Sequence, residues 1–483
     1  MNFKDKSLSV WQEKQFIVFL CVLAGVFIFQ NLGEAPLGYF DELKSAERST
    51  SFLTTGDWGA VHMNHEANFN KPPLQYWLNA LFYLGQTDKE LAVRWVNGFF
   101  CLALFIILPF WVKIYCPNVR WLSALSVYLL LVYGPFLEYA RIGILDMGAA
   151  FFCILTWVLI GLACRDVRWW AGVALVCVLG ALQKTPLPFA IWLFCLLGFG
   201  FNRTERVRLH NIWLWGSLLF ALLLASVWPT LQIIRFGNAY FDTYIKYELS
   251  EMVRRDFNYG PFTYIWWMSK KWFLFAGLAL VGNLWILLAK EFRKEKVLWL
   301  SALWVFLFFL GMSSLTGHSH RYLFPILPIM AVFAAWTWIK LLGNRPMLSV
   351  ILLLLSSIPC WITAHYHYHL KREEYAPYVE LWRELGEELK ATKYNEGIFI
   401  SMSFKEDSGA LNPYGMMLGS RYYGAISEKV IELDTAEDFH QLDSMNKPLL
   451  GIVARSRLQA LNDLSLPIEV LVEVEEAILL RIN

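Results

Sequence analysis

The sequence predicts an α-helical protein that crosses a membrane many times and ends in a small α/β domain. Of its 483 residues, 57% are hydrophobic and 17% are charged, and the mean hydropathy is +0.43. A typical soluble domain carries about 25% charged residues. Apolar runs of about 18–25 residues recur along most of the chain, and each is long enough to cross the hydrocarbon core of a bilayer. Beyond residue 370 these runs stop and short alternating segments follow.

The first apolar run, FIVFLCVLAGVFIFQNL, follows Lys4, Lys6 and Lys14. No small-residue cleavage site comes after it, so we expect a retained helix and not a removed signal peptide. Taking roughly 20 apolar residues as one crossing, we count about eleven spans. The expected spans lie near residues 16–33, 91–114, 119–135, 144–163, 168–182, 185–201, 210–234, 272–289, 297–314, 322–342 and 347–364.

The charges of the short loops predict which side of the membrane each loop faces, because cytoplasmic loops are enriched in Lys and Arg. If the chain starts in the cytoplasm, alternate loops fall on one side and are all basic. These loops contain Lys113, Arg120, Arg165, Arg168, Arg203, Arg206, Arg208, Lys290, Arg293, Lys294, Lys296 and Arg345. The segments then expected outside are 34–90, 136–143, 183–185, 235–271, 315–321 and everything after residue 364.

The last part of the chain, residues 370–483, is expected to form a small α/β domain on the outer face. It follows a membrane domain of residues 1–369, whose long outer loops are 34–90 and 235–271. Strands are predicted for EGIFISMS, KVIELD, KPLLGIVARS and IEVLVEVEEAILLRI, with helices near 436–445 and 456–463. The domain has no Gly-rich phosphate loop, so no chemistry is assigned to it.

Charge divides the chain in the same way. Residues 370–483 hold 12 Lys and Arg against 20 Asp and Glu, so residues 1–369 hold 30 against 20. A basic membrane part with an acidic tail argues against nucleic-acid binding and fits a partner surface of membrane lipids. The eight cysteines all lie at or before Cys360 with no CxxC pair, so neither a disulfide framework nor a thiol site is predicted.

Two carboxylates, Asp41 and Glu42, begin the first outer loop in the stretch GYFDELKSAERS. On a helix, Asp41, Ser45 and Arg48 would share one face by their spacing of four and three. Two interpretations stay open from this stretch alone. Asp41 caps an interfacial helix by accepting backbone N–H bonds, or it belongs to a catalytic site.

The segment NFNKPPLQYWLNAL places Lys71 before two prolines and an aromatic amphipathic helix. The prolines restrict the backbone and hold Lys71 on an ordered loop. One interpretation is a lysine that snorkels to the lipid headgroups. The alternative is a cation that binds the phosphate of a lipid.

Charged residues also mark the next two outer turns. In EYARIGILDMGAAFF, Arg141 precedes Asp146, which lies at the start of an apolar run. An ionised group there is costly and usually has a partner, so an Arg141–Asp146 ion pair is the alternative to a functional role. In GALQKTPLPF, Lys184 occupies the following outward turn and again precedes a proline.

Two further outer segments are basic. The long loop contains Arg254 and Arg255 among tyrosines and tryptophans, and TGHSHRYLFPILP contains Arg321 and Tyr322. Outward basic clusters usually face anionic headgroups or an anionic substrate. The convergence of several such loops beside two carboxylates predicts an anion site on the outer face.

Metal signals are weaker. The histidines of HMNHEA and HYHYH do not form a closed zinc ligand set at standard spacing. Neither a metal ligand nor another cofactor is therefore predicted, and a divalent metal has no support in the sequence.

The motifs GYFDELKSAERSTSFLTTGDW, NKPPLQYWL, ARIGILDM, QKTPLPF, NYGPFTYI and HSHRYLFPILP occur in the order and spacing of a known family. Over roughly residues 15–345 the chain resembles the polyprenyl-phosphate-dependent glycosyltransferases of the GT-C class. Its motifs are most similar to those of the aminoarabinose–lipid A transferase branch and its protein O-mannosyltransferase relatives. Asn258 and Tyr259 stand where relatives tend to carry histidine, so no metal site is carried over.

The resemblance implies an inverting glycosyltransferase that moves a sugar from a polyprenyl (undecaprenyl) monophosphate to lipid A or another cell-envelope acceptor. It implies a bacterial inner-membrane protein whose active site faces the periplasm. By similarity, Asp41 is the catalytic carboxylate, with Glu42 and Asp146 as further candidates. The implied ligands of the donor phosphate are Lys71, Arg141, Lys184, Arg254, Arg255, Arg321 and Tyr322.

Other activities stay open on the sequence alone. A protein O-mannosyltransferase-like enzyme or an oligosaccharide ligase would use the same architecture. A lipid-linked sugar flippase or transporter belongs to a different class. Transporters often show two similar halves, and the sequence contains no such repeat.

Overall fold

The computed structural model describes residues 3–37, 40–64, 66–85, 89–202, 205–247, 262–315, 319–343, 345, 347–358, 376–392, 398–401, 419, 423, 430–433, 437–444, 448–464, 466–474 and 477–483. Arg254 and Arg255 of the predicted phosphate ligands lie outside the described residues, as do most histidines of HMNHEA, HYHYH and HSHRY. The chain divides into two compact units. The first consists of Met1–Gln30, Phe69–Gln75 and Trp95–Tyr366, and the second of Asn31–Asn68, Tyr76–Arg94 and His367–Asn483.

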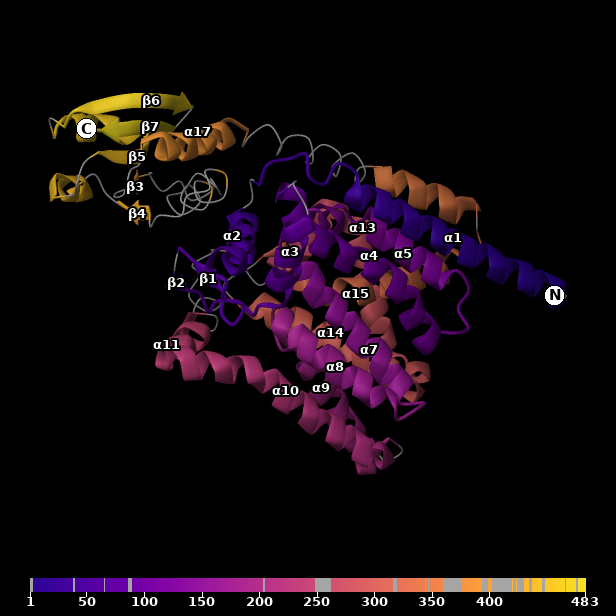
Figure 1. Ribbon diagram of the computed structural model, residues 1–483. Helices are drawn as coiled ribbons and strands as arrows, with labels where there is room; N and C mark the ends of the chain where they lie inside the picture. Colours follow the sequence, from indigo (N-terminus) through magenta and orange to yellow (C-terminus); the bar gives the residue numbers. More distant parts are fainter. Residues whose placement is uncertain are drawn as a thin grey trace. The chain divides into compact units, whose positions relative to one another are not determined.

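This division places residues of the first outer loop in the same unit as the C-terminal residues. The sequence predicts a boundary near residue 370 but gives no sign of this second feature. In Figure 1 the indigo helix α2 and the yellow strands therefore belong to one unit, although they come from opposite ends of the chain.

The chain is a multi-pass, mostly helical membrane protein. Among the described residues, six helices are long and apolar enough to cross a membrane. They are α1 (Phe3–Phe29), α4 (Lys89–Tyr115), α7 (Asp146–Ala163), α10 (Ile212–Phe236), α13 (Thr263–Leu288) and α14 (Lys296–Ser314). Four shorter apolar helices are α8 (Trp169–Gln183), α9 (Leu187–Phe201), α15 (Leu327–Leu342) and Met347–Ile358.

The expected third span, residues 119–135, is instead a broken pair of helices. Helix α5 (Leu122–Val132) and helix α6 (Gly134–Ala140) meet at an angle of 70°. The break follows from the sequence Gly134–Pro135, because proline has no N–H to donate into a continuing helix and starts a new one well. Tyr133 is extended at the junction, with φ −70° and ψ 91°.

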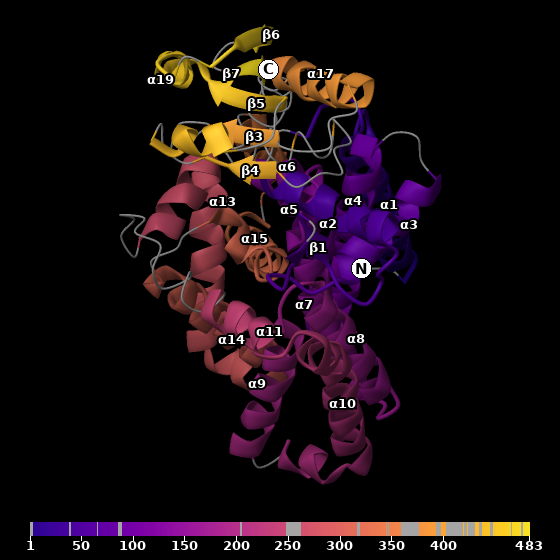
Figure 2. The ribbon, with the colours of Figure 1, turned by 60° about the vertical axis from the view of Figure 1, so that its left-hand side comes forward.

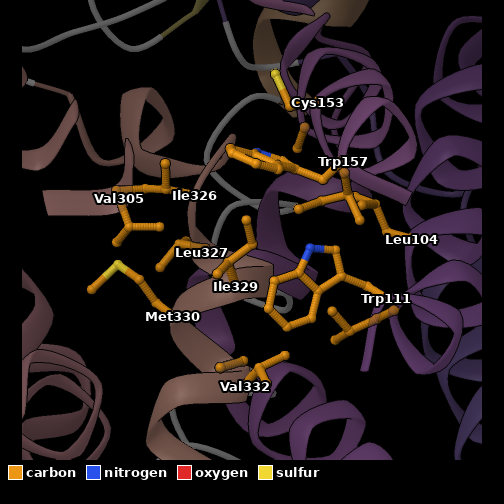
Figure 3. Close-up of a cluster of buried hydrophobic side chains, with 14 of the residues drawn as sticks. Leu104, Trp111, Cys153, Trp157, Val305, Ile326, Leu327, Ile329, Met330 and Val332 are labelled. Atoms are coloured by element: carbon orange, nitrogen blue, oxygen red, sulfur yellow. The ribbon is translucent and has the colours of Figure 1, made fainter. Parts of the chain in front are cut away.

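The core of the first unit forms around α15, which packs against both α13 and α5 (Figure 1). Every residue of α15 from Leu327 to Trp338 is buried. Figure 3 shows Trp111 of α4 beside Ile329 of α15, whereas Met330 of α15 extends to the other side, toward Val305 of α14. Lipid is as apolar as these side chains, so close packing rather than exclusion from water holds such helices together.

Short elements connect these helices. They are the single turn α11 (Asn238–Phe241), the π-helix Asp242–Tyr247, and the 3₁₀ helices Arg206–His210, Lys290–Lys294 and His320–Leu323. The last of these carries Arg321 and Tyr322, and it follows α14 directly before α15 begins.

The second unit contains two groups of elements. The first group is α2 (Phe40–Thr55), the antiparallel pair β1 (His62–Met63) and β2 (Glu66–Ala67), and most of α3 (Leu74–Gly85). The second group is α17 (Ala376–Thr392) and a sheet in the order β4-β3-β5-β7-β6 (Figure 2). Its strands are β3 (Ile398–Ser401), β4 (Val430–Glu432), β5 (Leu449–Ala454), β6 (Ile468–Val474) and β7 (Ala477–Ile482).

The sheet confirms the predicted α/β character of the C-terminal residues. Strand β3 runs parallel to β4 and β5, whereas β7 pairs antiparallel with β5 and β6. The expected single strand over residues 468–482 is wrong, because the structure divides it into β6 and β7, which pair with each other. The expected helices correspond to the 3₁₀ helix Glu437–Ser444 and to α19 (Leu458–Asn462).

The core of the second unit joins its two groups. Trp382 of α17 packs with Ile400 and Ile452 of the sheet, and the same cluster contains Leu43 of α2 and Val93. All six residues of β5 are buried, as expected for the central strand of this sheet. The helix that carries Asp41 and Glu42 is thereby anchored within its own unit.

Candidate active site

Asp41 and Glu42 occupy the first turn of α2, which begins at Phe40. A carboxylate there is stabilised by the positive end of the helix dipole. The Asp41 side chain is 32% exposed, and its Oδ1 lies 3.8 Å from Lys44 Nζ. The Ser45 hydroxyl donates to the Asp41 carbonyl. A solvent-accessible carboxylate on a fixed backbone is therefore compatible with both the cap and the catalytic interpretation.

Glu42 points elsewhere and is 2% exposed. Arg94 donates to both of its oxygens, from Nε to Oε1 at 2.7 Å and from Nη2 to Oε2 at 3.1 Å. Arg94 also donates to the carbonyls of Leu32, Ala35 and Pro36. These contacts give Glu42 a structural task, which is to hold Arg94 while Arg94 organises the chain before α2.

Arg48 is also nearly buried, at 5% exposed, and lies on the same helix. Its Nη1 donates to the Tyr76 hydroxyl at 3.0 Å. One turn along, Asn79 donates to Ser49 at 3.2 Å. These bonds between α2 and α3 fix the position of the helix that carries Asp41.

In the first unit, Asp146 starts α7 and is 4% exposed. Its Oδ1 lies 2.5 Å from Lys184 Nζ, and its Oδ2 lies 4.0 Å from Arg321 Nη1. Among the described residues, Asp146 and Arg141 form no ion pair, so this alternative from the sequence is wrong. Asp146 pairs instead with cations from two other predicted turns.

Tyr322 completes this cluster. Lys184 Nζ lies 5.9 Å and the Arg321 guanidinium carbon 6.0 Å from the centre of its ring. Both distances allow cation–π attraction. The Lys184 and Arg321 side chains are 15% and 16% exposed, so an excess of positive charge reaches the surface of the cluster. We call Asp146, Lys184, Arg321 and Tyr322 the cation cluster.

Proline sets the position of both cations. Lys184 is the C-cap residue directly after α8, which ends because Pro186 follows two positions later. Arg321 lies on the 3₁₀ helix His320–Leu323, just before Pro325. In the sequence, Lys184 was identified as a charge before a proline in an outward turn, and Arg321 as part of a basic outer segment.

Arg141 has a different environment. Its guanidinium donates to the carbonyls of Phe27, Ile28 and Gln30 at the end of α1. The last carbonyls of a helix have no partner within the helix, and a basic side chain can satisfy them. These contacts give Arg141 a capping task and weaken its candidacy as a phosphate ligand.

The chain from Tyr139 to Asp146 is held by amide side chains that no pattern in the sequence singles out. Asn97 donates to the carbonyls of Tyr139 and Ile142 at 2.8 and 2.7 Å. Gln75 donates to the Ile144 carbonyl at 2.7 Å, and it accepts from the Gln183 side chain. Lys71 lies four residues before Gln75 and is partly buried, with Pro72 and Pro73 buried beside it.

His320 precedes Arg321 and stacks on the Trp267 ring, with the ring centres 4.2 Å apart. Burial, together with the positive charges of Lys271 and Lys270, lowers the pKa of His320 to about 4, against a smaller opposing effect of Glu138. The imidazole is therefore neutral at neutral pH and adds no charge beside Arg321.

The structure thus brings Asp146, Lys184, Arg321 and Tyr322 into direct contact, with Lys71 and Arg141 in the same unit. Asp41 and Glu42 belong to the other unit. Within the described part of the chain, no group of three His, Cys, Asp or Glu side chains could hold a metal ion.

No protein-family model matches the chain. The chain is 30% identical over 202 residues to an undecaprenyl phosphate-alpha-4-amino-4-deoxy-L-arabinose arabinosyl transferase of Pectobacterium carotovorum, covering 39% of this chain and 34% of that protein. It is 23% identical over 352 residues to the Proteus mirabilis protein with this name and the suffix 1, covering 69% of this chain and 60% of that protein. The matched part spans only about a third of the Pectobacterium protein.

Solved structures match over far more of the chain. The crystal structure of ArnT from Cupriavidus metallidurans bound to undecaprenyl phosphate aligns with a TM-score of 0.72 at 15% identity, covering 97% of this chain and 98% of that one. The oligosaccharyltransferase of Archaeoglobus fulgidus aligns with a TM-score of 0.58 at 11% identity, covering 89% and 64%. The chain therefore has the fold of ArnT, and the resemblance to the polyprenyl-phosphate-dependent GT-C glycosyltransferases that its motifs predict is confirmed.

Proposed function

We propose that the protein is an inverting glycosyltransferase that moves a sugar from undecaprenyl monophosphate to an acceptor of the cell envelope. Lipid A is the first acceptor to test. The observation that carries the proposal is the cation cluster, in which two partly exposed cations share one buried carboxylate within an ArnT fold. The ArnT relative was crystallised with undecaprenyl phosphate, which supports a lipid phosphate as the ligand here.

The chemistry needs cations because the leaving group is a phosphate. As the glycosidic bond breaks, negative charge grows on the lipid phosphate, and fixed positive groups stabilise that charge most in the transition state. Lys184 and Arg321 are our first candidates, with Tyr322 between them and Lys71 on the proline-restrained loop. Arg254 and Arg255 stay candidates on sequence grounds alone.

Asp146 is better suited to positioning than to proton transfer. It is nearly buried and engaged by Lys184 and Arg321. A carboxylate in that position offsets the electrostatic repulsion between Lys184 and Arg321 and so keeps the two cations close together.

We assign the catalytic carboxylate to Asp41. Its side chain is 32% exposed, whereas both oxygens of Glu42 are bound by Arg94. Toward a hydroxyl acceptor, Asp41 would act as the general base. Toward a phosphate acceptor there is little proton to remove, and positioning of the acceptor would dominate.

We further propose eleven crossings of a bacterial inner membrane, with the active site and the C-terminal residues in the periplasm. The count takes the six long helices, the bent pair α5–α6 as one, and the four shorter apolar helices as spans. The basic loops expected in the cytoplasm support the orientation.

The test is transfer by the purified full-length protein. We expect it to convert lipid A when given undecaprenyl phosphate–aminoarabinose, with the product identified by mass spectrometry. Asp41→Asn should reduce transfer by about 100-fold or more if the carboxylate removes a proton, since general base catalysis contributes roughly 10²–10⁴-fold. Lys44→Gln changes the neighbour of Asp41 without removing the carboxylate and serves as the matched control. Full activity of a folded Asp41→Asn protein would refute the assignment.

Oligosaccharide transfer is the second candidate, because the archaeal oligosaccharyltransferase shares the fold over 89% of this chain. The mass added to the acceptor separates the two activities. A single sugar supports the first proposal, and a longer glycan supports the second.

A further inference from the structure

Two buried glutamines form an amide bridge next to the cation cluster. Gln75 and Gln183 are 108 residues apart in sequence and both are fully buried. The Gln183 Nε2 group donates to Gln75 Oε1 and to the Leu145 carbonyl. Gln75 Nε2 in turn donates to the Ile144 carbonyl at 2.7 Å. The two amides therefore bind each other and two successive carbonyls.

The bridge joins three segments that carry charged candidates. Ile144 and Leu145 immediately precede Asp146, and Lys184 immediately follows Gln183. Lys71 lies four residues before Gln75 in the sequence. The two prolines between them restrict the backbone conformation of the loop that carries Lys71. Movement of either glutamine side chain would release the start of α7, the end of α8 and the loop that carries Lys71 from one another.

Packing alone does not require this arrangement. Burying an amide costs free energy unless its hydrogen bonds are made. Apolar side chains of similar size would fill the space without this desolvation cost. Hydrogen bonds, however, fix direction and distance more narrowly than apolar contacts. The structure also leaves room for the bridge at Gly148, where an added Cβ would lie 2.2 Å from Gln183 Nε2.

We propose that the Gln75–Gln183 bridge is a positioning device, which holds the Lys71 loop in register with the Asp146–Lys184 ion pair so that both lysines engage one lipid phosphate. This inference rests on the proposed function. The two glutamines act through the lysines and take no part in the chemistry themselves.

The first test replaces each amide with a side chain of similar size that makes no hydrogen bond. We expect Gln75→Met and Gln183→Met to lower kcat for sugar transfer by roughly 10- to 100-fold, the range that misplacement of a catalytic group costs. KM for the lipid-phosphate sugar should change by less than about threefold, since fixed cations contribute most as charge develops in the transition state. The double variant should be no worse than the poorer single variant, because the two amides act as one unit.

The second test moves Gln183 without altering any polar group. Gly148→Ala should displace the flexible end of Gln183 and reproduce the loss seen with Gln183→Ala. In a Gln183→Ala background, Gly148→Ala should then have no further effect, because the side chain it displaces is gone. A loss of kcat that persists undiminished in that background would overturn the proposal.

Two control variants separate positioning from general damage. Gly216→Ala adds a methyl group in α10 where nothing lies within 4 Å. Asn283→Leu removes another buried amide that donates to a carbonyl of a neighbouring helix, Ala302, at 3.1 Å. Both proteins should keep wild-type kcat, and equal losses in Asn283→Leu would assign the effect to weakened packing.

Binding of undecaprenyl phosphate, measured on the same full-length proteins, separates failure of the inference from failure of the proposed function. If the wild type transfers sugar and the bridge variants do so equally well, the inference is wrong and the function stands. If the wild type binds undecaprenyl phosphate but transfers nothing, the function is wrong. Weaker binding by Gly148→Ala then still supports the bridge, because this free phosphate carries the charge that develops on the leaving group in the transition state, unlike the sugar donor. If the wild type does neither, both are wrong.

Discussion

At the scale of single residues, two buried carboxylates show how similar charges serve different purposes. Glu42 receives two bonds from Arg94, whose remaining donors bind backbone carbonyls. Asp146 receives one close contact from Lys184, and its second cation lies 4.0 Å away and reaches the surface. The first arrangement is closed and satisfies its donors internally. The second keeps positive charge available to an anion.

The closed pair should matter for stability. Removing one partner of a buried ion pair leaves an uncompensated charge and costs about 3–5 kcal/mol. We expect Arg94→Met to lower the thermal unfolding midpoint of the detergent-solubilised protein clearly. Adding Glu42→Leu should recover part of the loss, because no lone charge then remains buried.

The exposed pair Arg168–Asp166 provides the matched control, since Arg168→Met should leave the midpoint nearly unchanged. If Arg94→Met were as stable as the wild type, the structural task assigned to Glu42 would be wrong, and Glu42 would return as a catalytic candidate.

The sequence predicted some of these residues and not others for physical reasons. Lys184 stands out as a charge before proline at the end of an apolar run, and Arg321 stands out in a basic outer segment. Arg94 was missed because it lies within such a run, and its partner Glu42 is 52 residues away. Gln75 and Gln183 carry no charge, so only the fold reveals that they meet.

At the scale of elements, apolar length predicts the presence of helices better than their shape. The run near 119–135 is long enough for one span, yet Gly134–Pro135 breaks it into two helices at 70°. Helix α13 likewise contains a non-helical residue, Trp272, with φ −161° and ψ 93°. Trp272 has no proline or glycine beside it, so this kink leaves no signal in the local sequence.

The 3₁₀ helix His320–Leu323 should respond to pH. The pKa of His320 is lowered to about 4 in the folded protein, against about 6.5 when unfolded. Between these values the unfolded state binds more protons, so stability should fall as pH drops from about 6.5 toward 4. Burial is the largest cause of this lowered pKa, and the charged groups that act on it are Lys271 and Lys270 of α13, which lower it, and Glu138 of α6, which raises it.

His320→Phe retains a ring that can stack on Trp267 but cannot titrate. We expect the thermal unfolding midpoint of this variant to fall less than that of the wild type as the pH drops from about 6.5 toward 4. Identical pH profiles for the two proteins would show that His320 is not the titrating group.

At the scale of the whole molecule, composition and periodicity predicted a helical membrane part followed by a small α/β domain, and the helical membrane part and a mixed sheet near the C-terminus are confirmed. What they could not predict is that residues 31–68 and 76–94 group with the C-terminal residues. That grouping depends on tertiary contacts such as Leu43 with the cluster around Trp382, which link positions more than 300 residues apart. No local pattern encodes such a contact.

The last prediction concerns the orientation of the chain in the membrane. The basic loop with Arg168 is expected in the cytoplasm, and the C-terminal residues, including Glu473, are expected outside. Both side chains are exposed, at 87% and 51%, so a cysteine at either position should be reachable and cost little stability.

In a background without the native cysteines, a membrane-impermeant maleimide applied to intact spheroplasts should label Glu473→Cys and spare Arg168→Cys. Lysis should make both reactive, which controls for access to each position. Labelling of Arg168→Cys in intact spheroplasts would show that the proposed orientation is wrong and that this loop lies outside. The outer anion site would then face the cytoplasm, where a periplasmic acceptor such as lipid A in its final location could not reach it.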